Sequence, residues 1–164
     1  VYVFVAQYYG AKREERIGVA VWQAFWLTLC ITPFFVIGWW LMPKLFIFSE
    51  HPENIISLET SYFRWMILAA PSTVLTAAMA GFFSGLGKTT VVMATDILCT
   101  LINVVLSIVL VFGIGPFPEM GIDGAALATV ISSWVHIPIL GIAMFRPKNI
   151  SQYGLLSWGW DREL

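Results

Sequence analysis

The side chains best suited to chemistry lie inside long apolar stretches, where ionisable groups are costly and serve function by default. Asp96 is the one carboxylate within such a stretch. On a helix, Asn103 and Ser107 follow it by seven and eleven residues and therefore project within about 20° of it. This polar stripe is a candidate site for a proton or small cation. A competing interpretation has Asp96 reaching headgroup water and Asn103 forming an interhelical hydrogen bond.

A second apolar stretch repeats this arrangement. Thr129, Ser132, Ser133 and His136 fall at helical spacing. His136 can relay protons because the pKa of histidine lies near neutrality; the alternative is a hydrogen-bonded packing residue. Further polar groups in the apolar stretches complete a predicted substrate cavity. Its candidate lining residues are Gln23, Thr76, Thr100, Ser133 and His136.

Two local patterns are rejected as functional motifs. Residues 85–89 (GLGKT) resemble the end of a phosphate-binding loop, but Phe82 stands where that pattern requires its first glycine. Asn149 begins a glycosylation sequon in a segment predicted to face the cytoplasm. Because the sequence also shows no metal-ligand cluster and no Ser/His/Asp constellation, it does not predict an enzyme.

The composition excludes a water-soluble domain. Of 164 residues, 59% are hydrophobic and 12% are charged, whereas soluble domains carry roughly a quarter charged residues. The net charge of −1 supplies no basic patch for nucleic acid. Cys30 and Cys99 both lie in apolar stretches, which argues against a disulfide framework.

Four stretches are long enough to cross a bilayer, which needs about 20 apolar residues in a helix. They are residues 17–43, 65–87, 89–112 and 124–145. Helix is expected because every backbone N–H in lipid needs an internal partner. Pro33, Pro71 and Pro138 predict kinks, which serve either as hinges or as static packing features. The sequence therefore predicts an all-α, polytopic transmembrane bundle, with residues 1–9 as the end of another helix.

The connections between these stretches alternate in charge. Seven of the nine basic residues fall on one face of the predicted bundle: Lys12, Arg13, Arg16, Lys88, Arg146, Lys148 and Arg162. Because cytoplasmic loops carry an excess of Lys and Arg, this face is predicted to be cytoplasmic. Residues 146–164 then form a cytoplasmic linker, and the protein is expected in the inner (plasma) membrane.

Three segments together carry a family resemblance. They are residues 4–13 (FVAQYYGAKR), residues 81–89 (GFFSGLGKT), and residues 103–129 with NVVLS at the start and MGIDGAALAT at the end. In this order and spacing they resemble the multidrug and toxic compound extrusion (MATE) transporters. The resemblance implies an antiporter of twelve helices in two six-helix lobes. The four stretches would be its third to sixth helices, and a second lobe of the same protein would lie outside this chain.

The resemblance also implies a cation site in this lobe. Family members couple export to H⁺ or Na⁺, and some use an Asp on the first helix, an Asn and an Asp on the fifth, and a Thr on the sixth. Asn103 and Thr129 match the Asn and the Thr, whereas Ser107 replaces the second Asp. That departure weakens the case for Na⁺, and we expect Asp96 to compensate. The predicted cation or proton site is Asp96, Asn103, Ser107 and Thr129.

The predicted function is export of amphipathic or cationic organic compounds in exchange for H⁺ or Na⁺ by alternating access. The expected partners are a small organic substrate, the lipid bilayer and the second lobe, with no cofactor besides the coupling ion. One alternative is a lipid-linked oligosaccharide flippase of the same superfamily, which would need cations facing its cavity; the four stretches contain none. The other alternative is a non-transporting membrane scaffold.

Overall fold

Every regular secondary-structure element in the described part of the chain is a helix. The computed structural model describes residues 1–46, 48 and 51–156. Its elements are α1 (Tyr2–Gly10), the 3-10 turn η1 (Glu14–Arg16), α2 (Ile17–Phe46), α3 (Glu53–Gly85), α4 (Thr89–Phe112), α5 (Gly121–Met144) and α6 (Pro147–Tyr153). Within these residues, α2, α3, α4 and α5 are long and apolar enough to cross a membrane. The predicted all-α fold with four membrane-spanning helices is confirmed.

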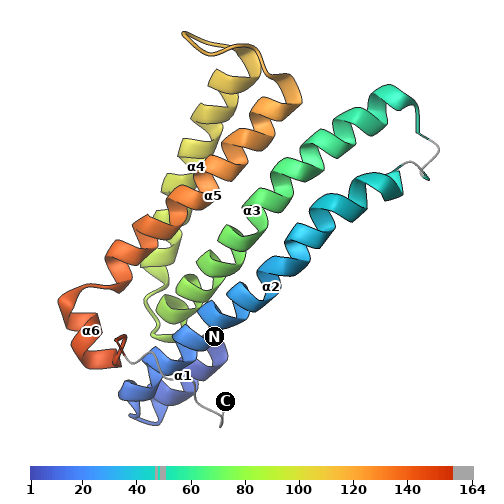
Figure 1. The fold of residues 1–164 in the computed structure, drawn as a ribbon. Helices are drawn as coiled ribbons and strands as arrows, with labels where there is room; N and C mark the ends of the chain where they lie inside the picture. Colours follow the sequence, from blue (N-terminus) through green and yellow to red (C-terminus); the bar gives the residue numbers. More distant parts are fainter. Residues whose placement is uncertain (47, 49–50, 157–164) are drawn as a thin grey trace.

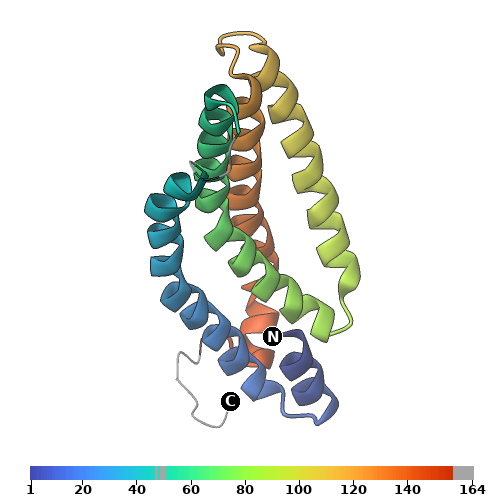
Figure 2. The same cartoon turned by 90° about the vertical axis from the view of Figure 1, so that its right-hand side faces the viewer.

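The four long helices form two antiparallel pairs. Helix α2 packs against α3, α4 packs against α5, and contact between α3 and α5 joins the pairs. Figure 1 shows the pairs diverging toward the connections α2–α3 and α4–α5, which we call the loop end. At the opposite end, which we call the α6 end, α1, η1 and α6 gather around the start of α2 (Figure 2).

Tight apolar packing holds the α6 end together. The buried cluster here consists of Val5, Ile17, Val21, Met79, Phe82, Phe83, Leu86, Leu140, Met144, Tyr153 and Leu155. Helix α1 approaches α3 so closely that a Cβ on Gly85 would lie 2.7 Å from the Val5 side chain. The Asn149 amide donates to the carbonyls of Ala143 and Met144 at 3.1 and 3.2 Å. It thereby satisfies backbone acceptors that the end of α5 would leave unpaired.

Tyr153 is the polar group at the centre of this cluster. Its ring packs edge-on against Phe82, with 5.5 Å between ring centroids, and Lys88 Nζ lies 5.4 Å from its centroid. Burial of the side chain, and then the nearby Glu14 and Tyr9, raise the pKa of the Tyr153 phenol. The phenol therefore stays protonated at neutral pH and adds no charge to the cluster.

The helices extend beyond the apolar stretches predicted from the sequence. Helix α3 begins at Glu53, twelve residues before the predicted start at residue 65. Smaller differences affect the other elements: α2 continues to Phe46, α5 begins at Gly121 and ends at Met144, and α6 forms within the predicted linker 146–164. The predicted bounds follow runs of uncharged residues. Helical hydrogen bonding continues beyond such runs into polar surroundings, where charged residues such as Glu59 and Arg64 of α3 are tolerated. The linker's residues 157–164 lie outside the described part.

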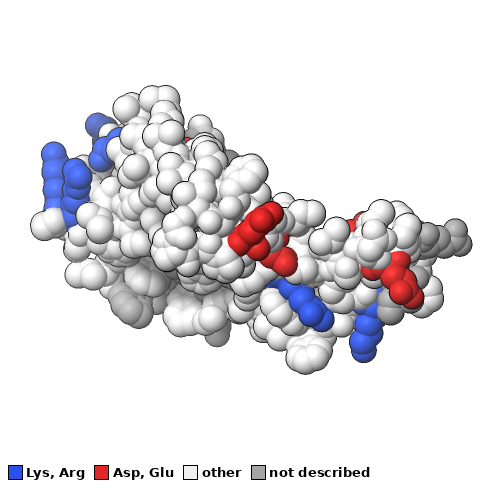
Figure 3. Space-filling view, turned by 90° about the horizontal axis from the view of Figure 1, so that it is seen from above, with Lys and Arg blue, Asp and Glu red and all other residues white. Residues whose placement is uncertain are grey.

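The two ends differ in charge. Six of the seven residues of the predicted basic face lie at the α6 end, together with Glu14 and Glu15; the seventh, Arg162, is outside the described residues. The loop end combines four acids with two basic residues: Glu53, Glu59, Glu119, Asp123, Lys44 and Arg64. Figure 3 looks onto the loop end and shows acidic groups on the central and right-hand parts of this surface. Which end faces the cytoplasm stays a prediction.

Candidate cation and substrate site

Asn103 connects α4 to α5 through its side-chain amide. Its Nδ2 donates to Ser132 Oγ at 3.1 Å and to Thr129 Oγ1 at 3.3 Å. Both hydroxyls use their single hydrogen within α5, where Thr129 donates to Ala125 O at 3.0 Å and Ser132 donates to Thr129 O at 3.1 Å. Their lone pairs therefore face the amide nitrogen, and this pattern sets the orientation of the Asn103 amide.

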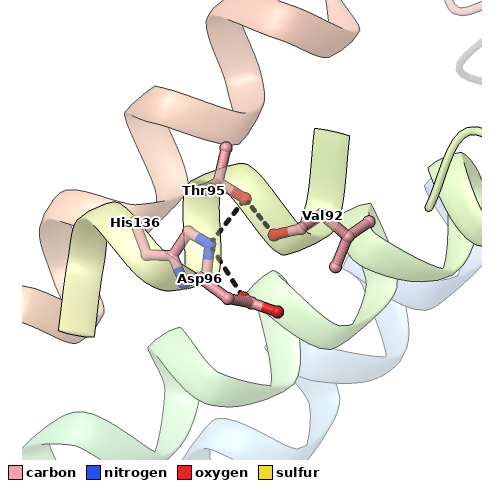
Figure 4. Close-up of polar contacts among 4 residues, drawn as sticks. All are labelled: Val92, Thr95, Asp96 and His136. Carbon is pink, nitrogen blue, oxygen red and sulfur yellow. Dashed lines mark hydrogen bonds and ion pairs between the residues drawn. The ribbon is translucent and has the colours of Figure 1, made fainter. Parts of the chain in front are cut away.

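About two helical turns closer to the α6 end, His136 of α5 meets two residues of α4 (Figure 4). His136 Nε2 lies 3.2 Å from Thr95 Oγ1 and 3.5 Å from Asp96 Oδ1. Thr95 in turn donates to Val92 O at 2.9 Å. The side chain of His136 is 11% exposed and that of Asp96 is 57% exposed. The His136 imidazole is therefore the more buried member of the pair, and the Asp96 carboxylate is the more exposed one.

These two clusters line one polar cavity of about 340 Å³ between α4 and α5. The lining residues are Asp96, Cys99, Thr100, Asn103, Thr129, Ser132, Ser133 and His136. The structure therefore brings together three of the four residues predicted for the cation site: Asp96, Asn103 and Thr129. It places with them three of the five predicted for the substrate cavity: Thr100, Ser133 and His136. Among the described residues, no group of three or more His, Cys, Asp or Glu side chains is placed to hold a metal.

Three predicted site residues lie away from this cavity. Ser107 is half-buried on α4, about one turn beyond Asn103 toward the loop end. Gln23 is half-buried on α2, which Figures 1 and 2 place on the far side of the bundle from α4. Thr76 lies on α3, and its Oγ1 is buried without a hydrogen-bond partner among the described residues. None of the three lines this polar cavity or the apolar cavity between α2 and α3 that is described below.

The sequence analysis missed Thr95, a buried residue whose hydroxyl oxygen accepts the hydrogen bond from His136. A signal for it exists, because Thr95 and the cavity residue Cys99 are four residues apart and so lie on one face of α4. The prediction named the adjacent Asp96 instead, because its side chain is a carboxylate. Only the packing of α5 shows that the Thr95 side of the helix is the buried one.

Close packing near the loop end keeps α4 and α5 within hydrogen-bonding range. A Cβ on Gly124 would lie 2.7 Å from the carbonyl carbon and oxygen of Leu110, so only glycine fits this contact. Helix α4 ends at Phe112, and the following Gly113, with a left-handed φ of +64°, terminates it. The returning chain then donates from Met120 N to Leu110 O at 3.0 Å. This junction fixes the register that places Asn103 opposite Thr129.

A second cavity, of about 740 Å³, lies between α2 and α3 and is almost entirely apolar. Five tryptophans line it: Trp22, Trp26, Trp39, Trp40 and Trp134. Its hydroxyl groups, on Thr28 and Thr32, donate to carbonyls of their own helix at 2.8 and 2.9 Å. Trp134 reaches it from α5 and donates from Nε1 to Leu68 O at 3.0 Å. The sequence analysis did not identify this cavity, because aromatic residues in an apolar stretch look alike whether they face lipid or a cavity.

Known proteins are similar to this chain over most of its length. The family model described as MatE matches residues 1–109 of the chain. The chain belongs to the MATE family. The resemblance inferred from residues 4–13, 81–89 and 103–129 is thereby confirmed, and the family is one of membrane transporters rather than enzymes. With four candidate spans, this MATE chain is a multi-pass membrane protein.

Curated relatives of this MATE chain carry names that refer to multidrug resistance. It is 32% identical over 152 residues to "Probable multidrug resistance protein YoeA" of Bacillus subtilis (strain 168), an alignment covering 92% of this chain and 33% of the relative. It is 27% identical over 158 residues to "Probable multidrug resistance protein NorM" of Acinetobacter baylyi, covering 96% and 35%. The chain therefore spans about a third of the length of these relatives.

Proposed function

We propose that this chain is part of a secondary transporter that exports amphipathic or cationic organic compounds in exchange for H⁺ or Na⁺. Membership of the MATE family and relatives named for multidrug resistance support this proposal. The observation that carries it is the polar cavity between two apolar helices, where a carboxylate, an imidazole and an amide meet. Polar groups within membrane helices are rare and mark ion or substrate pathways.

The coupling cation is proposed to bind in the α4–α5 cavity. Asp96 supplies the one carboxylate there, and Asn103 and Thr129 supply an amide and a hydroxyl already in hydrogen-bonding contact. Ser107 lies outside the cavity wall and joins this site only if α4 shifts along or rotates about its axis. Two arrangements of α4 against α5 would allow cation binding to favour one conformational state of the transporter over the other.

Substrate is proposed to contact both cavities. The Thr100, Ser133 and His136 side chains of one offer polar contacts, and the tryptophan-lined wall of the other offers apolar and aromatic surface. Large apolar cavities with few fixed polar groups accept many ligands, and aromatic faces attract organic cations. Gln23 and Thr76, on helices α2 and α3, would contribute in a conformation where those helices turn toward the cavity.

Transport is proposed to follow alternating access between this lobe and a second lobe of the same protein. The α6 end would face the cytoplasm of the inner (plasma) membrane, because most of the basic residues lie there. Residues 147–153 form a short helix bound to this end, well placed to begin the connection between lobes. A flippase for lipid-linked oligosaccharide is disfavoured, since no Lys or Arg lines either cavity of the described chain.

Drug efflux by the full-length protein tests this proposal. Cells lacking their own efflux pumps would express the wild-type protein, Asp96→Asn or Asn103→Ala, and ethidium efflux would be followed by fluorescence. We expect wild-type cells to extrude ethidium and both variants to lose most of that activity at equal membrane expression. If both variants retained full wild-type efflux, the proposed cation site would be wrong. If the wild-type protein exported no compound, the non-transporting scaffold would be the remaining alternative.

A further inference from the structure

The ionisable groups of the polar cavity are few and close together. Asp96, Cys99 and His136 are the titratable side chains that line it. Helix α3, the other long helix packed against α5, carries no titratable residue between Trp65 and Gly85. Any proton that binds within the cavity must therefore bind at α4 or at His136 itself. Of these groups, Asp96 and His136 form the one pair in direct contact.

The hydrogen bonds around His136 determine which ring nitrogen carries the proton. Thr95 has one hydroxyl hydrogen and donates it to Val92 O, so at the imidazole its oxygen can act only as an acceptor. An ionised Asp96 is likewise an acceptor. Nε2 faces both oxygens and must carry the hydrogen. Among the described residues, no hydrogen-bond partner contacts the other nitrogen, Nδ1, which is left to accept a proton.

The same arrangement disfavours a sodium ion. Hard cations bind several oxygen ligands at once. Here the cavity contains a single carboxylate, and His136 Nε2 lies 3.5 Å from one of its oxygens. The nearby hydroxyls of Thr129 and Ser132 already accept N–H groups from Asn103. The cavity therefore presents hydrogen-bond donors where Na⁺ would need free oxygens.

We propose that Asp96 and His136 together bind the coupling proton of this lobe, and that Thr95 positions the imidazole. This inference rests on the proposed function and specifies its ion. A proton from water binds Nδ1 of His136, whose side chain is 11% exposed, and the exposed Asp96 carboxylate beside Nε2 balances the new positive charge. In the loaded state Nδ1 and Nε2 both carry hydrogens, and the pair changes from a net charge of −1 to zero.

Proton binding then strengthens the contact between α4 and α5. In the empty state a neutral imidazole lies beside the carboxylate, while in the loaded state an imidazolium faces it as a full ion pair. The loaded lobe is therefore the one in which the α4–α5 seam is closed near the α6 end.

Nitrogen-15 NMR of histidine in the full-length protein tests the pair without relying on transport. The purified protein would be labelled at histidine and titrated in detergent between pH 9 and pH 4, with the His136→Gln spectrum identifying the His136 signal. We expect the Nε2–H tautomer at high pH, conversion to imidazolium on acidification, and no change with added NaCl. In Asp96→Asn the midpoint should fall by about one pH unit, a tenfold weaker proton affinity. His51, which lies between α2 and α3, serves as the internal reference.

Variants of the positioning residue separate its role from simple packing. Thr95→Val keeps the shape but removes the oxygen that accepts from Nε2, and it should shift the His136 midpoint; Thr95→Ser restores the oxygen and should restore the wild-type midpoint. A Nδ1–H tautomer, a midpoint unchanged in Asp96→Asn, or ethidium transport in proteoliposomes driven by a Na⁺ gradient alone would overturn the proton pair. A wild-type protein that shows the expected titration but transports nothing would instead overturn the proposed function.

Discussion

The two cavities of this bundle differ in how their polar groups are used. In the α4–α5 cavity, hydrogen bonds cross between helices, from Asn103 to α5 and from His136 to α4. In the larger α2–α3 cavity, the hydroxyls of Thr28 and Thr32 bond back to their own helix and leave an aromatic wall. Interhelical hydrogen bonds fix the direction of each group, which a small ion requires. An apolar wall fixes little, which suits compounds recognised mainly by surface contact.

Backbone spacing explains part of this difference. Around Gly124, α4 and α5 are in contact through backbone atoms, whereas a Cβ on Gly38 of α2 would meet Ile67 Cδ1 of α3 at an ordinary 3.4 Å. Short polar side chains can bridge only the closer pair. The wider pair is bridged by large aromatic side chains, and a cavity of about 740 Å³ remains between them.

The largest effect is expected from adding a methyl group at the close contact between α4 and α5. Gly124→Ala places a methyl group 2.7 Å from the Leu110 backbone, which cannot move without shifting α4. We expect a loss of about 1–3 kcal/mol of stability. The matched control is Gly38→Ala, where the methyl group meets only the end of a flexible side chain and unfolding should be unchanged or slightly harder. Thermal unfolding of both variants in the same detergent compares the two helix pairs, and equal melting temperatures would contradict this account.

The next effect concerns the amide that bridges α4 and α5. Asn103→Leu removes both hydrogen bonds to Thr129 and Ser132 while keeping a similar volume. We expect ethidium efflux to fall about tenfold, equivalent to roughly 1.4 kcal/mol. Thr73→Val is the control, because Thr73 is exposed on α3 and its hydroxyl donates to Ala70 O of its own helix. If both variants export ethidium equally well, the polar cavity has no special part in coupling.

A smaller and more selective effect is expected in the aromatic cavity. Trp26→Ala removes an indole from the wall lined by α2, and Trp26→Phe restores an aromatic face there. We expect efflux of flat aromatic cations to weaken a few-fold in the alanine variant, consistent with a cation–π contribution of about 0.5–1 kcal/mol, and to recover partly with phenylalanine. Resistance profiles over a panel of compounds measure this. Uniform loss for every compound would assign Trp26 to folding rather than to selectivity.

The smallest effect is expected where α5 touches the aromatic cavity. Trp134→Phe keeps most of the ring but removes the hydrogen bond to Leu68 O. Hydrogen bonds between membrane helices contribute about 0.6 kcal/mol on average, so the stability loss should be of that size. The same unfolding assay used for Gly124 can detect it. A loss as large as that of Gly124→Ala would mean that Trp134, rather than the backbone contact, sets the position of α5.

The polar stripe could be predicted from sequence because helical periodicity places Asp96 and Asn103 on one face whatever surrounds them. The cavity they line required the partner helix, and its wall omits Ser107, although Ser107 belongs to the same stripe. Thr95 escaped the prediction because its importance depends on a side chain 41 residues away. The extent of α3 also escaped it, since hydrophobicity locates the lipid-embedded part of a helix and not its ends.

By itself, the sequence determined that this chain crosses a membrane, which stretches span it, and which family it belongs to. These properties follow from local composition, from periodicity and from motifs such as NVVLS at residues 103–107. The pairing of α4 with α5 was decided by tertiary structure, through the glycine contact at residue 124. That pairing placed His136 beside Asp96, and it separated the polar cavity from the aromatic one. The physical reason is that a helix presents many faces, and only packing selects the one that meets a partner.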